Sequence, residues 1–281
     1  SALEVGEAWK EEGYKPERSF EVVIFSDEEG SRFNSGFHGS KAIVGIDRIE
    51  DTLALTDQNG LTFEEVLKTN GLTLNDYLAA KRDLQSEYEL FIEVHIEQGK
   101  RLEKQNLPCG IVNGIAGPVW VKYSFIGEAG HAGNTPMNGR KDALVAASEF
   151  IFQIPNIPKQ ISDTAVATVG KLAVHPNGVN VIPGEVNLYV DMRDITQINQ
   201  QLLVEKINRL AKDVANKYEV EVKAEEKTRI APIPISEEIQ VQLKEVFAEF
   251  EIDSYILPSG AGHDAMIIGT EIPVAMIFVQ S

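Results

Sequence analysis

Cysteine is nearly absent from this sequence, which has one, Cys109, among 281 residues. A single thiol forms no intrachain disulfide, and this favours a reducing cytoplasm over an oxidising compartment. No stretch approaches the roughly 18 apolar residues of a membrane-spanning helix, and no basic segment followed by an apolar one opens the chain. We therefore expect a soluble, cytoplasmic protein without a membrane partner, in which Cys109 is an inert, partly buried thiol.

Positive charge is also scarce. The 26 Lys and Arg residues stand against 43 Asp and Glu residues, which gives a formal net charge of -17. Nonspecific nucleic-acid binding depends on Lys and Arg that displace counterions, so the charge balance argues against nucleic acid as a partner. A small molecule, a metal ion or another protein remains open.

The composition is otherwise ordinary, with 43% hydrophobic and 25% charged residues. These fractions are typical of a globular protein and not of a disordered or fibrous one. A chain of 31.0 kDa exceeds the usual size of one domain, so two domains are expected.

The two ends of the chain are expected to share one helix-covered mixed sheet. A helix ends at Gly13, and the apolar strand from Glu21 to Ser26 is typical of a strand buried on both faces. Short surface helices follow between Gly45 and Ala80. The segment from Tyr88 to Gln105 is predicted as a strand up to Val94 and a helix afterwards.

From Gly114 the pattern becomes β-α-β-β-α-β, the order of a ferredoxin-like unit with one apolar sheet face. Its strand EVNLYVDMRD alternates cleanly, so one face packs inward and the opposite face, with Arg193, is open to a ligand. The inward residues are Val186, Leu188, Val190 and Met192, while Asn187 and Asp191 share the face of Arg193. The long helix that follows is predicted to be amphipathic, with Ile198, Leu202, Leu210 and Val214 at helical spacing.

After this unit the chain is expected to return to the first sheet. A proline-punctuated linker precedes a helix from Glu237 to Phe250, and IPVAMIFV is again an unbroken apolar strand. The predicted division is 1–113 and 229–281 for the two parts of one domain, with 114–228 as an inserted second domain.

Three stretches contain residues suited to chemistry. Glu28 and Glu29 in SDEEGSRF follow an apolar strand, where paired carboxylates can bind a cation and move a proton. A solvated acidic turn is the alternative. His95 lies at the end of a predicted strand, where it is either a metal ligand or a histidine with a purely structural role. His131 lies among glycines in GHAGNTPMNGR, which favours a functional loop over a loop held by a simple hydrogen bond.

Six ordered motifs carry a family resemblance: SDEEGSRF, HIEQG, GHAGNTPM, GVNVIPG, DMRD and SGAGHDA. In this order the chain resembles the amidase, hydantoinase and carbamoylase branch of the dinuclear metallopeptidase (M20) superfamily. That branch includes N-carbamoyl-L-amino acid hydrolase, allantoate amidohydrolase and β-alanine synthase. The resemblance covers nearly the whole chain and implies a catalytic domain with an inserted lid and dimerisation domain.

The resemblance also implies roles for individual residues. Glu29 is similar to a metal ligand and Glu28 to the general base that takes a proton from the attacking water. His95 resembles a ligand of the second metal ion, and Gln98 a substrate contact. The implied cofactors are two divalent ions, Zn or Mn.

In the inserted domain, His131 resembles an oxyanion-stabilising histidine that acts in the partner subunit's site, which implies a homodimer. Asn180 and Arg193 resemble residues that hold the substrate carboxylate. A salt bridge from Arg193 to Asp191 or Asp194 is the alternative.

The sequence contains three other histidines. His263, with Asp264, is expected to support the site from outside, whereas His38 and His175 are expected to be exposed or in loops.

One departure from the family pattern bears on activity. Members carry a further histidine and a bridging aspartate upstream, and a histidine in a loop after the last strand, and the sequence given has none of these. With Glu29 and His95 alone, each metal ion would have about one ligand, whereas stable sites need three or four. The chain as written is therefore expected to be a fragment that binds metal weakly or not at all and is inactive.

For the intact protein, the resemblance implies hydrolysis of a linear C–N amide bond in a small ureido or amide acid. An N-carbamoyl-L-amino acid or allantoate is the expected substrate. Two alternatives remain: an aminoacylase or dipeptidase of the same fold, and a non-catalytic dimeric binding protein.

Overall fold

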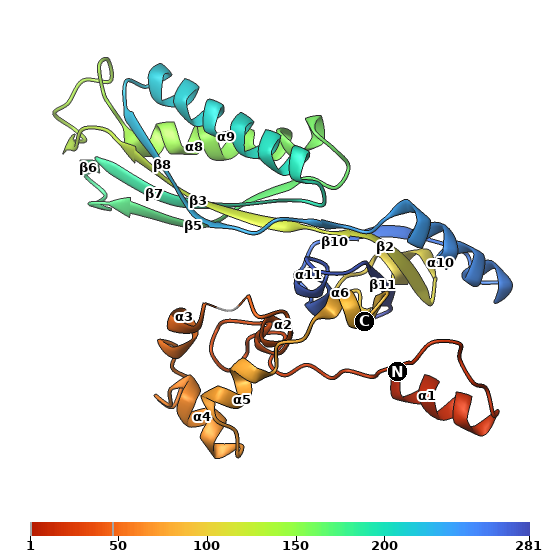
Figure 1. Cartoon of the computed structure of the whole chain (residues 1–281). Coiled ribbons are helices and arrows are strands. Elements are labelled where there is room, and N and C mark those ends of the chain that lie inside the picture. Colours follow the sequence, from red (N-terminus) through yellow and green to blue (C-terminus); the bar gives the residue numbers. More distant parts are fainter. Residues whose placement is uncertain (1, 47) are drawn as a thin grey trace. The chain divides into compact units, whose positions relative to one another are not determined.

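The computed structural model describes residues 2–46 and 48–281, which form two compact units. Unit 1 comprises Ser1–Asn113, Ile235–Leu257 and Gly262–Ser281, and unit 2 comprises Gly114–Pro234 and Pro258–Ala261. Helices and sheets occur in both units, which confirms the mixed α/β class (Figure 1). In the described part of the chain, every helix is too short or too polar to cross a bilayer.

Unit 2 contains an antiparallel sheet whose strands lie in the order β5-β7-β3-β8. Helices α8 and α9 lie together on one face of this sheet (Figure 1). Along the chain its elements are β3 (Gly117–Ile126), α8 (Ala143–Gln153), β5 (Val166–His175), β7 (Glu185–Asp194), α9 (Gln197–Lys217) and β8 (Glu221–Arg229). The single turns η1 (Ile154–Asn156) and η2 (Pro158–Gln160) follow α8.

The core of unit 2 forms where the sheet meets these helices. The four residues of β7 predicted to face inward, Val186, Leu188, Val190 and Met192, are fully buried, which confirms the alternation of this strand. Phe125 and Phe150 bring β3 and α8 together, with ring centroids 5.3 Å apart. Arg193 lies on the opposite face of the sheet, away from the helices.

The predicted apolar face of α9 was partly wrong. Ile198 is 80% exposed and Leu202 is 38% exposed, whereas Leu203 and Ile207 are fully buried. The buried face of α9 is therefore rotated about the helix axis relative to the predicted face. It includes Gln200, whose side-chain amide donates to the carbonyls of Gly117 and Ile230. Apolar spacing alone does not reveal that a polar side chain lies on the buried face.

A separate two-stranded sheet follows the end of β3 and precedes the start of β7. It consists of β4 (Gly130–His131) and β6 (Val181–Ile182), which pair antiparallel although α8 and β5 lie between them in the chain. The Gly127 amide, just before β4, donates to the Gly184 carbonyl, just after β6.

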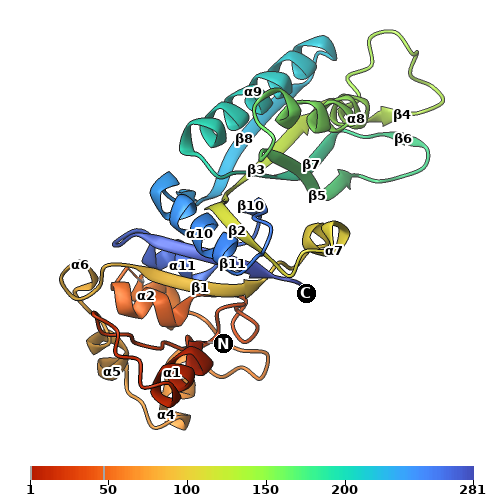
Figure 2. The same ribbon diagram turned by 90° about the vertical axis from the view of Figure 1, so that its right-hand side faces the viewer.

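Unit 1 is built around the parallel pair β1 (Phe91–Ile96) and β11 (Val274–Val279) (Figure 2). The sheet order is β1-β11-β2-β10, with β2 (Cys109–Ile115) and β10 (Ile256–Ser259). The last two residues of β2, which fall within unit 2, pair with the short β9 (Ile233–Pro234). The helices are α1 (Ala2–Glu11), α2 (His38–Val44), α3 (Ile49–Leu53), α4 (Phe63–Thr69), α5 (Leu74–Ala79), α6 (Leu84–Glu87), α7 (Arg101–Gln105), α10 (Glu237–Glu249) and α11 (Asp264–Ile268).

The predicted buried strand from Glu21 to Ser26 was wrong. These residues form no strand in the described structure, and Ile24 is 78% exposed. A strand needs a neighbour to accept and donate its backbone hydrogen bonds, and β1 pairs only with β11 among the described strands. Side chains hold this segment instead, because Glu21 accepts hydrogen bonds from Arg82 and Tyr88.

The expectation for His38 was also wrong. His38 begins α2 and is only 4% exposed. Its ring lies 6.0 Å from that of Phe33 and 5.0 Å from that of Phe63, measured between centroids. An aromatic cluster under α4 and α5 therefore buries a histidine whose sequence neighbours gave no sign of it. His175, at the end of β5, is exposed as expected.

Candidate functional site

The two adjacent glutamates lie in a tight turn. Asp27 has a positive φ of 55° and its carboxylate accepts a hydrogen bond from the Arg32 amide. Gly36 passes so close to this turn that an added Cβ would lie 2.3 Å from the Glu28 carbonyl oxygen. The turn needs glycine at that position, and it places Glu28 half-buried and Glu29 exposed.

His95 is positioned by the parallel strand pair. It lies one residue before the end of β1, opposite Phe278 of β11. Its Nδ1 lies 2.8 Å from its neighbour's carbonyl, Ile96 O. Because a carbonyl only accepts, Nδ1 carries the proton and Nε2 keeps a lone pair that can bind a metal ion.

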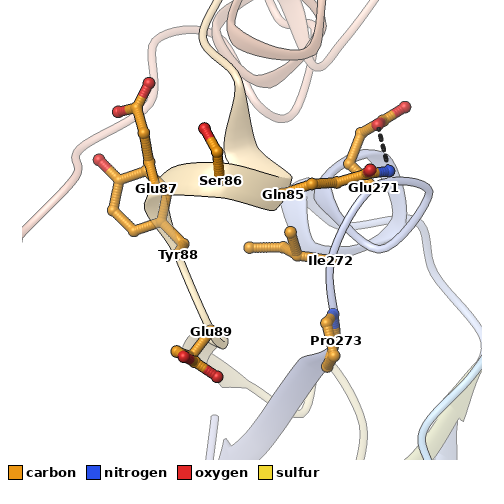
Figure 3. A pocket seen from close by; sticks show the side chains of 8 residues that line it. All are labelled: Gln85, Ser86, Glu87, Tyr88, Glu89, Glu271, Ile272 and Pro273. Atoms are coloured by element: carbon orange, nitrogen blue, oxygen red, sulfur yellow. Dashed lines mark hydrogen bonds between the residues drawn. The ribbon is translucent and has the colours of Figure 1, made fainter.

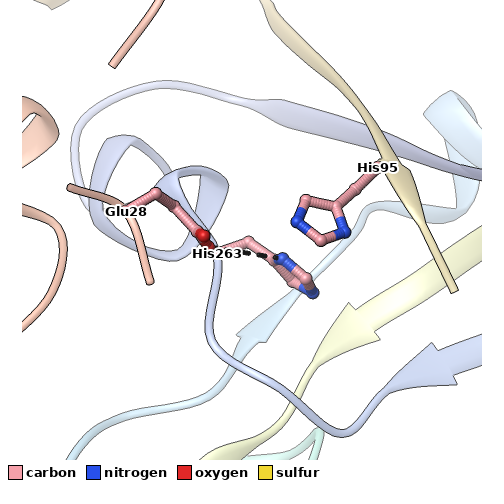
Figure 4. Close-up of side chains that lie close together, drawn as sticks. All are labelled: Glu28, His95 and His263. Carbon is pink, nitrogen blue, oxygen red and sulfur yellow. Dashed lines mark ion pairs between the residues drawn. The ribbon is translucent and has the colours of Figure 1, made fainter. Parts of the chain in front are cut away.

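His263 directly precedes α11 and meets His95 and Glu28. The ring centroids of His95 and His263 are 4.5 Å apart, and His263 Nδ1 lies 3.8 Å from Glu28 Oε1. Each of the three residues offers one ligand atom, and these atoms all lie within 4.8 Å of one another. Figure 4 shows the three side chains converging from different elements of unit 1, and we call them the His–Glu cluster.

The electrostatics of the His–Glu cluster suit a cation. Burial, and then the nearby His95, lower the pKa of His263 to about 3, so its ring is neutral at pH 7 and can act as a ligand. Burial and the nearby carboxylates of Glu29 and Asp264 raise the pKa of Glu28. Carboxylates whose negative charges are crowded in this way favour a positive partner.

Glu29, predicted as a metal ligand, lies outside the His–Glu cluster. Its Oε1 accepts a hydrogen bond of 2.6 Å from Gln98 Nε2. Gln98 was predicted to contact substrate, and it has a positive φ of 52° in the segment between β1 and α7. The structure thus joins two predicted site residues to each other beside the cluster.

Glu93 is a site residue that the sequence reasoning missed. Its Oε2 accepts a hydrogen bond from the Ala265 amide at 2.8 Å, and its Oε1 lies 4.0 Å from His263 Nδ1. Burial raises its pKa to about 7. The available signal was spacing, because residues two apart on a strand share a face and Glu93 precedes His95 by two. Asp264, expected to support the site, is buried and accepts a hydrogen bond of 2.6 Å from Ser40.

In unit 2 the ring of His131 is held by the backbone of its own loop. Its Nδ1 accepts hydrogen bonds from the amides of Gly133 and Asn134, each at 3.1 Å. Nδ1 therefore carries no proton, and the neutral ring carries its proton on Nε2, where it can be donated. The loop hydrogen bond that was the alternative role for His131 is thus present. It leaves the Nε2–H group of the exposed ring available as a donor.

The loop that carries His131 is closed by Arg140 and by Asn180. The Arg140 guanidinium donates to the carbonyls of Ala132, Thr135 and Pro136. The Ala132 amide donates to the Asn180 carbonyl at 2.9 Å. Two predicted site residues, His131 in β4 and Asn180 directly before β6, therefore lie together at the two-stranded sheet.

Arg193 lies at the other end of the same sheet. It is next to last in β7, opposite Pro118 of β3. Its guanidinium forms two hydrogen bonds to Asp191, so the salt bridge weighed as an alternative is present. At about 3.4 Å per residue in an antiparallel strand, the part of β7 from Glu185 to Arg193 spans about 27 Å, and the β4–β6 sheet lies beyond Glu185. Within one copy of unit 2, Arg193 and His131 therefore cannot contact one small molecule.

A separate hollow of 320 Å³ lies between residues 85–89 and 271–273 of unit 1 (Figure 3). Gln85 donates to Glu271 across it at 3.2 Å. Glu87 is paired with Arg82, and Glu89 with Arg18. Its lining includes no histidine or cysteine and none of the predicted site residues, so it has no evident part in the chemistry of the site.

The profile of a known family, "Peptidase family M20/M25/M40", matches residues 1–281. An N-carbamoyl-L-amino-acid amidohydrolase of Pseudomonas sp. (strain NS671) is 41% identical over 288 residues, covering 100% of this chain and 68% of the relative. The allantoate amidohydrolase of Escherichia coli (strain K12) is 33% identical over 267 residues, covering 95% of this chain and 64% of the relative.

The fold is matched by solved structures as well. The crystal structure of a hydantoinase/carbamoylase family amidase from Burkholderia multivorans superposes with a TM-score of 0.86 and 31% identity. The match covers 99% of this chain and 67% of that one.

Proposed function

This chain belongs to peptidase family M20/M25/M40, and we propose that it is part of an amidohydrolase that cleaves a linear C–N amide bond. The proposed substrate is an N-carbamoyl-L-amino acid or allantoate, the compounds named for its relatives. The observation that carries the proposal is the convergence of Glu28, His95 and His263 in unit 1.

The His–Glu cluster fits a divalent cation, for which we propose Zn²⁺ or Mn²⁺. Two neutral imidazole nitrogens and a carboxylate oxygen form a donor set that such ions accept. When bound, the ion would supply Lewis-acid polarisation of the substrate carbonyl and of water. Glu29 is proposed as a further ligand, for a second ion, once its hydrogen bond to Gln98 is exchanged.

Glu28 is the proposed general base. Its carboxylate is half-buried, and it has one oxygen near His263 and a second for a proton. It would take a proton from the attacking water and pass it to the leaving nitrogen. Hydrolysis of a carbamoyl group in this way yields the amino acid, CO₂ and ammonia.

His131 is proposed to donate a hydrogen bond to the oxyanion that forms on the substrate carbonyl. Support comes from its tautomer, because two backbone amides occupy Nδ1 and leave the proton on the exposed Nε2. Arg193 and Asn180 are proposed to hold the carboxylate of the substrate, and Gln98 to contact its polar groups.

Unit 2 is proposed to be a ferredoxin-like lid through which two copies form a dimer. The distance of about 27 Å along β7 supports a second copy, because His131 and Arg193 otherwise serve different molecules. The outer edge of β5 is unpaired in the described structure. The turns η1 and η2 contact β5, and on α8, which leads into them, Val145 is 45% exposed and Phe152 is 80% exposed. An open strand edge with apolar neighbours is suited to pairing with its own copy.

The substrate is tested by product analysis. The complete reading frame that contains this chain is incubated with Mn²⁺ or Zn²⁺ and with N-carbamoyl, allantoate or N-acetyl substrates. Ammonia from the first two supports the proposal. Acetate without ammonia would instead indicate an aminoacylase, and no product from any substrate would favour a binding protein.

The inactivity expected for this chain by itself stays a prediction. The sequence suggested about one ligand for each ion, whereas the His–Glu cluster offers three possible donor atoms to one ion. Assays of the 281-residue chain beside the complete reading frame decide the matter.

A further inference from the structure

Asp191 and the Gly260 carbonyl hold the Arg193 guanidinium from two sides. Arg193 Nε donates to Asp191 Oδ1 at 2.9 Å, and Nη2 donates to Oδ2 at 2.7 Å. Nη1 donates to the Gly260 carbonyl oxygen at 2.6 Å. All three residues belong to unit 2, although Gly260 is far from the other two in the sequence.

These contacts leave part of the guanidinium available. Three of its five N–H groups are engaged, so two remain, one on Nη1 and one on Nη2. Arginine can bind a carboxylate through both of these terminal nitrogens. The side chains of Arg193 and Asp191 are 27% and 30% exposed. A ligand from solvent can therefore reach Arg193 without first breaking the pair.

We propose that Asp191 is a positioning residue that, with Gly260, orients Arg193 so that its two remaining N–H groups receive the α-carboxylate of the substrate. This inference rests on the proposed function for the substrate class. Asp191 then does more than form a surface ion pair. Together with the Gly260 carbonyl it fixes the plane of the guanidinium before the ligand binds.

Asp191 has two opposite effects on carboxylate binding at Arg193: its negative charge weakens binding, and its hydrogen bonds favour binding by orienting the guanidinium. The direction in which affinity changes when the charge is removed therefore tests the inference. If Asp191 only neutralised Arg193, removal of its charge would strengthen the attraction for a carboxylate. If it orients Arg193, the same change leaves a mobile guanidinium that must be ordered at binding, and carboxylate binding weakens.

The binding test compares two ligands, N-carbamoyl-L-alanine and ethylurea, which is the same molecule without its carboxylate. Calorimetry is done with Mn²⁺ on the complete reading frame carrying Glu28→Gln, so that N-carbamoyl-L-alanine is not hydrolysed during the titration. It measures both ligands before and after the addition of Asp191→Asn or of the control Asp213→Asn, an exposed position on α9. We expect Asp191→Asn to weaken N-carbamoyl-L-alanine about tenfold and to leave ethylurea unchanged. Equal or tighter binding of N-carbamoyl-L-alanine would overturn the inference.

A second readout needs no substrate. The ¹H–¹⁵N signal of Arg193 Nε, assigned by its loss in Arg193→Lys, is expected to shift in Asp191→Asn and to stay in place in Asp213→Asn. An unchanged signal in Asp191→Asn would show that Asp191 does not hold the guanidinium. If the Glu28→Gln protein without a second substitution binds neither ligand, the proposed function fails, and with it the carboxylate role, while this signal still decides whether Asp191 orients Arg193.

Discussion

His95 and His263, which are far apart in the sequence, lie with their ring centroids 4.5 Å apart. The first lies one residue before the end of β1, and the second directly precedes α11, a helix that contacts both β1 and β11. Glu28 completes the His–Glu cluster from a turn near the start of the chain. Three segments distant in sequence thus meet at one point of unit 1.

His263 is predicted to contribute to metal binding. His263→Ala is expected to weaken Mn²⁺ or Zn²⁺ binding by at least about tenfold, because one of three donors is removed. Calorimetric titration of the chain with each metal measures the effect. His175→Ala, at an exposed position of unit 2, is the matched control. Equal affinities in the two variants would remove His263 from the site.

Gly133 is predicted to be needed for the placement of His131. A Cβ at this position would lie 3.3 Å from His131 Cε1 and 3.5 Å from Nδ1. Gly133→Ala should therefore displace the ring and lower kcat about tenfold with little loss of stability. Steady-state kinetics and thermal unfolding measure both quantities.

The control for that substitution is Gly170→Ala in β5, where an added Cβ meets no atom within 4 Å. The explanation fails if both variants keep full activity, or if Gly133→Ala acts only by unfolding the protein.

Tyr123 is predicted to make unit 2 sensitive to alkaline pH. Burial raises the pKa of Tyr123 above its usual value of 10, and its hydroxyl donates to Asn208 at 2.7 Å. The unfolded chain then loses this proton at a lower pH than the folded one. The stability from the neutral phenol is complete below pH 10 and is lost as the pH rises through the folded-state pKa.

Urea unfolding at pH 8 and pH 11 tests this sign. Tyr123→Phe should reduce the alkaline loss of stability, whereas Tyr14→Phe, whose ring is 55% exposed, should not. An identical loss in all three proteins would show that another group is responsible.

The proposed dimer predicts an asymmetry between the two helices of unit 2. Phe152 on α8 and Ile198 on α9 are both 80% exposed, but only α8 leads into the turns η1 and η2 that contact β5. Phe152→Glu is expected to raise the dimer dissociation constant at least about tenfold, and Ile198→Glu to leave it unchanged. Sedimentation analysis of the unsubstituted protein and both variants measures the dissociation constants. A monomeric unsubstituted protein, or a dimer weakened only by Ile198→Glu, would contradict the prediction.

Local pattern predicted much of unit 2. The alternation of β7 revealed the buried face and the opposite face with Arg193, since a strand has a period of two and one face packs against helices. Helix α9 was predicted as a long amphipathic helix, but its buried face was not predicted correctly. Gln200 lies on that face because it donates to two buried carbonyls that the sequence does not reveal.

The site of unit 1 was predictable only in part. Family motifs pointed to Glu28, Glu29 and His95, and the spacing of two residues places Glu93 on the same face of β1 as His95. The approach of His263 to Glu93 and Glu28 depends on tertiary packing, which local spacing does not reveal. The prediction of a buried strand from Glu21 to Ser26 was wrong for a related reason. Whether an apolar segment forms a buried strand depends on a neighbouring strand as well as on its own residues.

The most direct test of the account is ammonia release from N-carbamoyl-L-alanine by the complete reading frame with Mn²⁺, compared between the unsubstituted protein and Glu28→Gln. The account predicts ammonia from the first and a rate lower by about 10²-fold or more in the second, because the proton acceptor is lost. Full ammonia release by Glu28→Gln would contradict the assignment of the base, and acetate from N-acetyl substrates without any ammonia would contradict the proposed substrate.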